Sequence, residues 1–132
     1  IMGRVIAVCI SKEKGTQKYR IPEGEFIEEW GIKDDAHAGK WHRQVSLLSY
    51  DKIQEFRAKG AEIEDGAFGE NLVVEGFDFA KLPVGTKFRC NDVVLERRRS
   101  ARNAITAARS SRRWATASCR ERAFLREFFM EA

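Results

Sequence analysis

All ten glycines and both prolines of this 132-residue chain lie within its first 96 residues. Between these turn-forming residues stand short apolar segments that are rich in valine, isoleucine and phenylalanine. Such segments predict β-strands, because β-branched and aromatic side chains pack well on a pleated surface. A series of short strands separated by glycine turns is typical of a barrel or a folded sheet. The sequence therefore predicts a mainly β fold, a barrel with one or two short helices.

The strands and one helix can be placed from the local pattern. Ile53 and Phe56 share one face of a helix over residues 50–59, with Ser49 at its N-cap and Gly60 at its C-terminal stop. The predicted strands cover residues 2–10, 25–30, 44–48, 71–74, 86–90 and 93–96.

The composition changes abruptly between Glu96 and Arg97. Residues 1–96 hold 14 Lys and Arg against 17 Asp and Glu, whereas residues 97–132 hold 10 arginines against 3 acidic residues. The net charge thus moves from −3 to +7 across this point, although the whole chain carries +4. We therefore divide the chain into a β-barrel body, residues 1–96, and an arginine-rich tail, residues 97–132. The tail shows no regular apolar period before Ser118, and we expect it to be irregular or helical.

Other features narrow the class of protein. No apolar run approaches the roughly 20 residues that cross a bilayer, and no signal-peptide pattern opens the chain. Cys9, Cys90 and Cys119 lie far apart, without the spacing of a metal site. An odd, sparse set of cysteines suits a reducing compartment, so we expect a cytoplasmic protein.

Four motifs in the body carry a family resemblance. In order, they are Lys14-Gly15-Thr16-Gln17-Lys18, Asp35-Ala36-His37-Ala38-Gly39-Lys40-Trp41-His42-Arg43-Gln44-Val45-Ser46-Leu47-Leu48, Gly69-Glu70-Asn71-Leu72 and Leu82-Pro83-Val84-Gly85. Each is weak alone, but their order and spacing together resemble the small stand-alone bacterial MOSC proteins, relatives of the C-terminal domain of molybdenum cofactor sulfurase. One departure is Asp34, where the family pattern leads us to expect glycine, so this turn is strained if it needs a positive φ.

The resemblance implies a MOSC-type, pyruvate-kinase-like and mainly antiparallel β-barrel with a cleft for an anionic ligand. It also implies a cysteine that carries sulfur as a persulfide. The sulfur comes from a pyridoxal-phosphate-dependent cysteine desulfurase, and its target is a metal–sulfur centre. Some relatives instead bind the molybdenum cofactor and reduce N-hydroxylated compounds. Partners implied by the family are such a desulfurase or a protein of molybdenum cofactor biosynthesis, and the cofactor is molybdenum or the molybdenum cofactor. Both roles need a reactive thiolate.

The family cysteine follows the strand that corresponds to residues 93–96, and here the sequence departs completely. We hypothesise that the tail is a frameshifted copy of the missing segment. Reading residues 101–128 one base out of frame with permitted codons restores glycine, proline and a cluster of cysteines. Sequencing the gene across codons 94–102 tests this hypothesis, and an uninterrupted ancestral frame would contradict it. Whether the present chain is an enzyme stays open.

The motifs supply the candidate site residues. Asp35, His37 and His42 are candidates for metal or anion binding, and capping of a turn by Asp35 and His37 is an equal alternative. Glu70 and Asn71 could contact a ligand, although backbone hydrogen bonds that fix their loop are the better explanation.

Basic residues in the same motifs could line the anion cleft. They are Lys14, Lys18, Lys40 and Arg43, with Arg43 favoured because it precedes a buried strand. Surface lysines are usually solvated, which is the alternative for the others.

The cysteines and the tail allow further predictions. We predict that Cys9 is a core residue and that Cys90 is structural. Cys119 lies among arginines that would lower its pKa, yet we do not assign it the family's catalytic role. The alternative function is a non-catalytic module in which the body binds an anion and the basic tail contacts nucleic acid or a partner. Without a recognisable motif, we prefer to interpret the tail as an accidental basic segment. A barrel that lacks its native closing strands would expose edges, and a homodimer is then expected.

Overall fold

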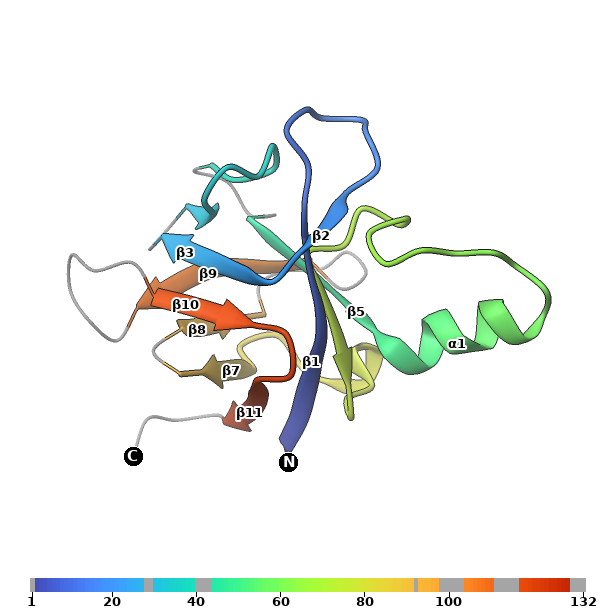
Figure 1. The fold of residues 1–132 in the computed structure, drawn as a ribbon. Helices are drawn as coiled ribbons and strands as arrows, with labels where there is room; N and C mark the ends of the chain where they lie inside the picture. Colours follow the sequence, from blue (N-terminus) through green and yellow to red (C-terminus); the bar gives the residue numbers. More distant parts are fainter. Residues whose placement is uncertain are drawn as a thin grey trace.

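The chain is mainly β, as the sequence predicts (Figure 1). The computed structural model describes residues 2–27, 30–39, 44–91, 93–97, 104–110 and 117–128. The strands are β1 (Met2–Ile10), β2 (Tyr19–Ile21), β3 (Glu23–Ile27), β4 (Gly31–Ile32), β5 (Val45–Ser49), β6 (Leu72–Glu75), β7 (Lys87–Cys90), β8 (Val93–Glu96), β9 (Ala104–Ser110), β10 (Ala117–Arg120) and β11 (Phe124–Phe128). The helices are α1 (Tyr50–Ala58) and the short 3₁₀ helix η1 (Phe79–Lys81).

Strands from the two ends of the chain close the main sheet into a ring. Its order is β11-β7-β8-β9-β5-β6-β1-β2, and β11 also pairs with β1. The first part of β1 lies beside β11, with Met2 opposite Arg126, and its last part lies beside β2, with Val8 opposite Ile21. A second, smaller sheet has the order β10-β3-β4. The ring therefore encloses an interior that side chains from most of the described strands can fill.

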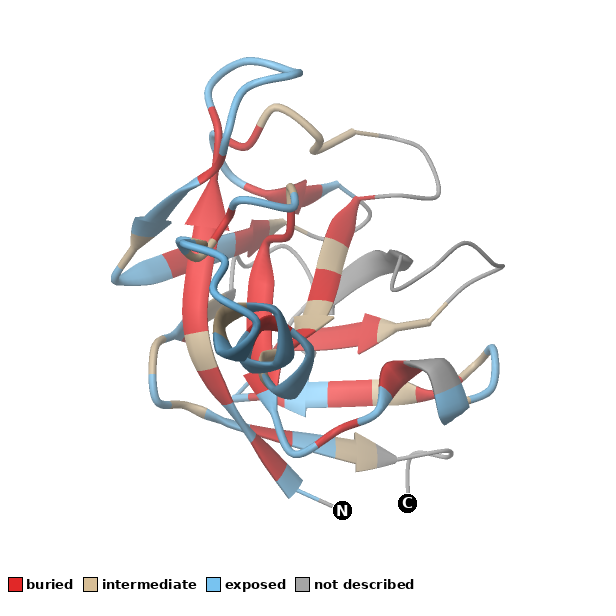
Figure 2. Cartoon of the chain, turned by 90° about the vertical axis from the view of Figure 1, so that its right-hand side faces the viewer, coloured by how far each residue is buried: buried red, intermediate tan, exposed pale blue. Residues whose placement is uncertain are grey.

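The core has two parts, one inside the barrel and one beneath α1. Inside, Phe88 packs edge-on against Phe77 and Phe79, with ring centroids 5.4 and 5.6 Å apart. Beneath α1, Ile53 packs with buried residues of β1 and β6. Figure 2 shows buried residues running along the strands behind the helix, whose outer surface is exposed. The helix thus covers the outer surface of the barrel and does not enter it.

Several predicted elements are confirmed. The strand over residues 2–10 has the predicted bounds, and α1 begins after Ser49, which has the extended backbone of an N-cap but makes no side-chain capping hydrogen bond. Gly60 adopts a φ of 93°, as its predicted stop position requires. No helix in the described part of the chain is long and apolar enough to cross a membrane.

The tail is neither irregular nor helical over its described residues. β9 pairs with β8 and β5, β10 pairs with β3, and β11 pairs with β1 and β7. Apart from the β8–β9 pair, these strands have partners far away in the sequence, and a local apolar period does not report such pairing. The break in composition therefore falls between two paired strands, β8 and β9. The barrel edge that we expected to be open is occupied by β11, whereas the oligomeric state stays a prediction.

The turn before Asp35 explains why the family pattern has glycine at position 34. The backbone N–H of Asp35 donates to the carbonyl of Ile32 at 3.1 Å, which closes a four-residue turn. Asp34 is its third residue and has a φ of 69°. A positive φ at this position alone is typical of a type II turn, which favours glycine. The strain that the sequence predicts at this turn is therefore present in its backbone.

Replacing Asp34 by glycine is expected to raise the free energy of unfolding by up to about 1 kcal/mol, because glycine adopts a positive φ without steric cost. Urea denaturation measures this change. Asp51→Gly is the matched control: Asp51 lies in the first turn of α1, where glycine loses helix propensity and a favourable charge, so a cost of about 0.5–1 kcal/mol is expected. Destabilisation by both substitutions would contradict the assignment of strain to Asp34.

Candidate functional site

The motif residues gather at one end of the barrel. β1 runs antiparallel to β6, and β5 runs parallel to β6. The last residues of β1 therefore lie beside the first residues of β5 and β6. Ser11 follows β1, Gln44 precedes β5 and Asn71 precedes β6, and all three are buried. Three motifs that are separated in the sequence thus converge at this end.

Lys18 is the centre of a buried polar network. Its side chain is 1% exposed, and its Nζ lies 2.6 Å from Oδ1 of Asp35. The same Nζ lies 3.0 Å from Nδ1 of His37 and 3.4 Å from Oγ of Ser11. An ammonium group has three hydrogens, so these three partners match its capacity to donate. Lys18 is therefore not the solvated surface lysine that was its alternative.

Asp35 joins this network to the adjoining strands. Its Oδ1 also accepts from the backbone N–H of Ser11 at 3.0 Å, and its Oδ2 accepts from Nδ2 of Asn71 at 3.1 Å. Asn71 in turn donates to the carbonyl of Cys9 and accepts from the backbone N–H of Ser46, each at 3.0 Å. Asp35 thus forms hydrogen bonds with residues that are distant in the sequence. The sequence had instead indicated that it caps a local turn or binds a metal or an anion.

His37 is half-buried beside Lys18. Because the Lys18 ammonium only donates, Nδ1 of His37 accepts, and the proton of the neutral ring is on Nε2. Burial lowers the pKa of His37, and the charges of Lys18 and Lys14 lower it further, while Asp35 opposes them. The imidazole is therefore neutral near pH 7.

Glu70 has the loop-fixing role that the sequence favoured. Its carboxylate accepts from the backbone N–H groups of Gly66 and Phe68, both at 3.0 Å. Burial raises the pKa of Glu70, and these backbone hydrogen bonds oppose that rise. Gly66 needs to be glycine, because its φ is 93° and a Cβ would lie 2.4 Å from the carbonyl oxygen of Lys18. The loop that Glu70 organises is thus pressed against Lys18.

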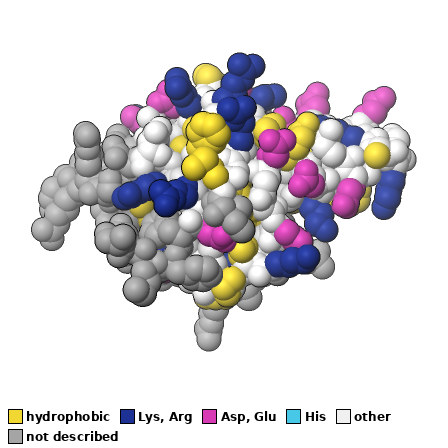
Figure 3. All heavy atoms as spheres, turned by 90° about the horizontal axis from the view of Figure 1, so that it is seen from below, with side chains coloured by type: hydrophobic (Ala, Val, Ile, Leu, Met, Phe, Trp, Pro, Cys, Tyr) yellow, Lys and Arg dark blue, Asp and Glu magenta, His cyan; other side chains and the backbone are white. Residues whose placement is uncertain are grey.

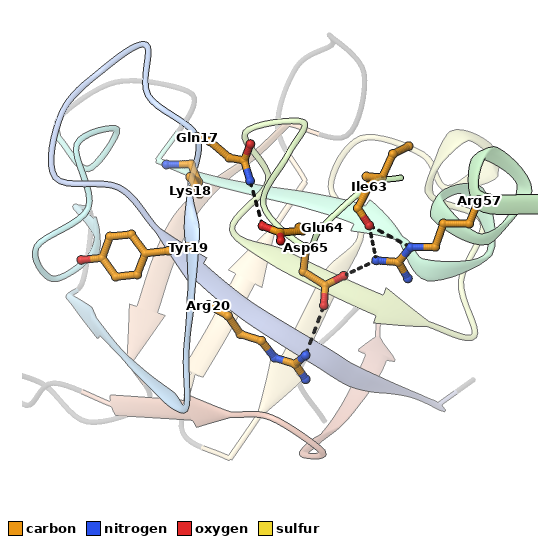
Figure 4. A pocket seen from close by; sticks show the side chains of 8 residues that line it. All are labelled: Gln17, Lys18, Tyr19, Arg20, Arg57, Ile63, Glu64 and Asp65. Carbon is orange, nitrogen blue, oxygen red and sulfur yellow. Dashed lines mark hydrogen bonds and ion pairs between the residues drawn. The ribbon is translucent and has the colours of Figure 1, made fainter. Parts of the chain in front are cut away.

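A cavity of about 530 Å³ lies next to the network (Figure 4). Arg20 and Arg57 lie on two sides of it, and Asp65 lies between them at 3.3 Å from each guanidinium. Arg57 also donates to the carbonyl of Ile63 at 3.0 and 2.8 Å, which holds the loop after α1. The lining residues are Gln17, Lys18, Tyr19, Arg20, Arg57, Ile63, Glu64 and Asp65.

Sequence reasoning did not identify Arg20, Arg57 or Asp65. They come from β2, from α1 and from the loop that follows α1, and no local motif links them. Long-range packing of that loop against the start of β2 brings them together. The predicted residues Lys40, His42 and Arg43 lie outside the described residues, and Lys14 is exposed.

All three cysteines of the chain are buried, with exposures of 0% for Cys9, 1% for Cys90 and 1% for Cys119. Cys9 lies in the core, as predicted, and burial raises its pKa to about 12. The geometry under which neighbouring arginines would lower the pKa of Cys119 is not present: its pKa is raised, first by a hydrogen bond with Cys90 and then by burial. Its neighbour in space is a thiol, so the arginines near it in the sequence do not control its ionisation.

A metal centre requires several His, Cys, Asp or Glu side chains gathered around one point. Over the described ranges, no group of three or more His, Cys, Asp and Glu side chains is arranged to hold a metal ion. A cysteine-ligated molybdenum also needs an accessible thiolate, which the buried cysteines do not provide. The residues present therefore do not fit a cysteine-bound molybdenum atom.

A comparison with known protein families identifies the family of this chain. The family profile described as the MOSC domain matches residues 34–118. The chain belongs to the MOSC domain family. The match includes Asp35, His37, Glu70 and Asn71, and it continues past Glu96 into the arginine-rich segment. No curated protein matches the chain.

Solved structures share the MOSC fold at low sequence identity. The YuaD protein of Bacillus subtilis has a TM-score of 0.76 and 15% identity, over 95% of this chain and 94% of its own. A hypothetical protein has a TM-score of 0.65 and 15% identity, over 99% and 68%. YiiM of Escherichia coli has a TM-score of 0.61 and 14% identity, over 98% and 71%. These likenesses establish the fold of the MOSC domain described above.

The Lys18–Asp35 pair can be tested for its structural contribution. Lys18→Met should lower the free energy of unfolding by about 3–5 kcal/mol, because it leaves the buried Asp35 charge without its cation. The double variant K18M/D35N should be more stable than the sum of the two single losses predicts, by at least about 1 kcal/mol. Denaturant titration of the four proteins gives this coupling energy.

Lys33→Met serves as the control for that experiment. Lys33 lies 3.6 Å from Glu25, but both side chains are exposed, at 57% and 47%. Its loss should cost less than about 1 kcal/mol. Equal effects of K18M and K33M, or strictly additive effects of K18M and D35N, would contradict a buried and coupled pair.

Proposed function

We propose that this MOSC domain takes part in molybdenum cofactor handling by binding a phosphate-bearing pterin ligand at the Lys18 end of the barrel. The proposal rests on the buried network of Lys18, Asp35 and Asn71, which stands beside a ligand-sized cavity. A buried ion pair adds little net stability, because the cost of desolvation offsets the attraction. A network of this kind next to a cavity is therefore a candidate for a functional role.

The cavity offers donors that suit a phosphate group. Cavities of roughly 300–1,000 Å³ commonly hold small ligands, and the volume of about 530 Å³ lies in that range. Guanidinium groups bind phosphate through paired hydrogen bonds, and Arg20 has a side chain that is 50% exposed. Asp65 and Glu64 also line the cavity, so an arriving phosphate competes with Asp65 for the guanidinium hydrogens. The buried ammonium of Lys18 positions the wall of the cavity and does not contact the ligand.

The proposed function does not include the transfer of sulfur by a cysteine of this chain. A persulfide forms when a thiolate attacks the sulfur of a donor, and both groups must meet. The exposures of Cys9, Cys90 and Cys119 do not exceed 1%. While β10 stays paired with β3, a pyridoxal-phosphate-dependent cysteine desulfurase therefore has no exposed thiol to load, and the role that we propose is one of binding.

Nucleic-acid binding through the tail is less well supported. The described parts of the tail are strands of the two sheets, so their backbone is paired within the domain. On the face opposite the Lys18 end, the described Lys and Arg side chains are intermixed with Asp and Glu (Figure 3). The described side chains on this face therefore do not form the continuous basic stripe that phosphate backbones favour.

Titration calorimetry of the full chain tests the binding role. A pterin monophosphate should bind, inorganic phosphate should bind more weakly and molybdate alone should not bind. Arg20→Ala should weaken the binding of pterin monophosphate by about tenfold, as expected for the loss of one charge-assisted contact worth about 1.5 kcal/mol. Lys81→Ala is the control, because Lys81 is an exposed cation beyond the opposite end of β6.

A second arm tests the sulfur-carrying role on the same protein. Incubation with a cysteine desulfurase and cysteine should leave the mass of the folded chain without an added sulfur atom. Equal affinity of the wild type, R20A and K81A for the pterin monophosphate would overturn the binding site. Efficient loading of sulfur on Cys119 would overturn the assignment of a binding role without sulfur transfer.

A further inference from the structure

Two of the three thiols lie in direct contact inside the barrel. The Sγ atoms of Cys90 and Cys119 are 2.7 Å apart, although 29 positions separate the two residues in the sequence. Cys90 is the last residue of β7 in the main sheet, and Cys119 lies in β10 of the smaller sheet. A disulfide bond has a length of about 2.05 Å, so the sulfurs need to approach by only roughly 0.7 Å. The fold itself brings this pair together across two sheets.

The third cysteine is separated from the pair by the barrel wall. Cys9 belongs to the small cluster beneath α1, with Ile53 and Val73, whereas Cys90 and Cys119 belong to the cluster inside the barrel. The Cys9 sulfur belongs to a different cluster from the sulfurs of Cys90 and Cys119. Its raised pKa of about 12 makes Cys9 a poor nucleophile. The chain therefore holds one adjacent pair of thiols and one isolated thiol that serves as an internal reference.

The two thiols of the pair are not equivalent. The pKa of Cys90 is lowered, first by its hydrogen bond with Cys119, and burial opposes this effect. The backbone N–H of Arg120 and the charge of its side chain lower the pKa of Cys90 further. Cys119 keeps its proton, because its hydrogen bond to the Cys90 sulfur and its burial raise its pKa. Cys90 is thus the thiol that ionises first, and Cys119 is the protonated thiol in contact with it.

We propose that Cys90 and Cys119 form an oxidisable dithiol, which a small hydroperoxide converts into a disulfide that links β7 to β10. Both sulfurs are buried, so the oxidant reaches them when β10 opens. In the described part of the chain β10 pairs with β3 alone, which makes it an edge strand and the natural point of local opening. The inference is independent of the proposed ligand site.

The reaction balances with hydrogen peroxide as the oxidant. The Cys90 thiolate attacks one peroxide oxygen, the O–O bond breaks, and a sulfenic acid forms as the other oxygen leaves and is protonated to water. The Cys119 sulfur then attacks the Cys90 sulfur, so that the S–S bond forms and the S–O bond breaks. The departing hydroxyl takes the Cys119 proton and leaves as a second water. The two thiols lose two electrons and the peroxide gains them.

Mass spectrometry of the full chain tests the dithiol, when the chain is oxidised in its folded state and unfolded only afterwards. After treatment with hydrogen peroxide, unfolding and alkylation, the wild type should carry one alkyl group where the untreated protein carries three. Its mass before alkylation should fall by two hydrogen atoms, and the peptide containing Cys90 should be linked to the peptide containing Cys119. The oxidised protein should unfold at a higher temperature than the reduced protein, because the cross-link restricts the unfolded chain.

Variants make the assignment specific. Cys9→Ser should form the same link at the same rate, whereas Cys90→Ser should lose it and should not form a link between Cys9 and Cys119. Oxidation in urea supplies the comparison for an unfolded chain, in which mixed pairings are expected. Three alkylatable thiols in the treated wild type, a link that includes Cys9, or a product that forms only in urea would each overturn the proposal. Loss of ligand binding in R20A bears on the proposed function alone and leaves this result unchanged.

Discussion

A charged lysine buried at the end of a barrel sets the conditions that the surrounding chain must meet. An ammonium group that is removed from water needs a counter-charge and acceptors for its hydrogens. Lys18 obtains these from Asp35, His37 and Ser11, which come from the loop after β4 and from the end of β1. Asp35 in turn requires donors, and Asn71 supplies one from the start of β6. The loops at this end are thereby held by a single chain of polar contacts.

That chain of contacts has a consequence for how the site works. Because Lys18 and Asp35 neutralise each other in the interior, neither presents its charge to a ligand. The groups at the adjacent cavity, Arg20 and Arg57, are instead held by Asp65 within reach of solvent. Gln17 and Lys18 of the first motif form part of the cavity wall, whereas both of its guanidinium groups come from residues outside the motifs.

The tail shows how sheet pairing tolerates an unusual composition. A strand is specified by partners on either side and by which residues face the interior, and the backbone supplies its hydrogen bonds whatever the side chains are. β11 places Leu125 in the core while Arg126 beside it is exposed, which is the alternation that a barrel strand requires. The same alternation in β10 buries Cys119 and exposes Arg120. A segment rich in arginine can therefore complete the ring, provided that its few apolar residues fall on the inner face.

The sequence alone determined the elements whose cause is local. The strand over residues 2–10 and the helix between Ser49 and Gly60 follow from the local apolar pattern and from capping, and both are present in the structure. The strained turn at Asp34 was expected from the family resemblance, and its positive φ is present too. Tertiary structure alone decided the burial of Lys18, the strands of the tail and the contact of Cys90 with Cys119. The physical reason is that a charge, a strand partner and a thiol pair are satisfied by groups distant in the chain. Local pattern carries no information about which of those groups the fold brings within bonding distance.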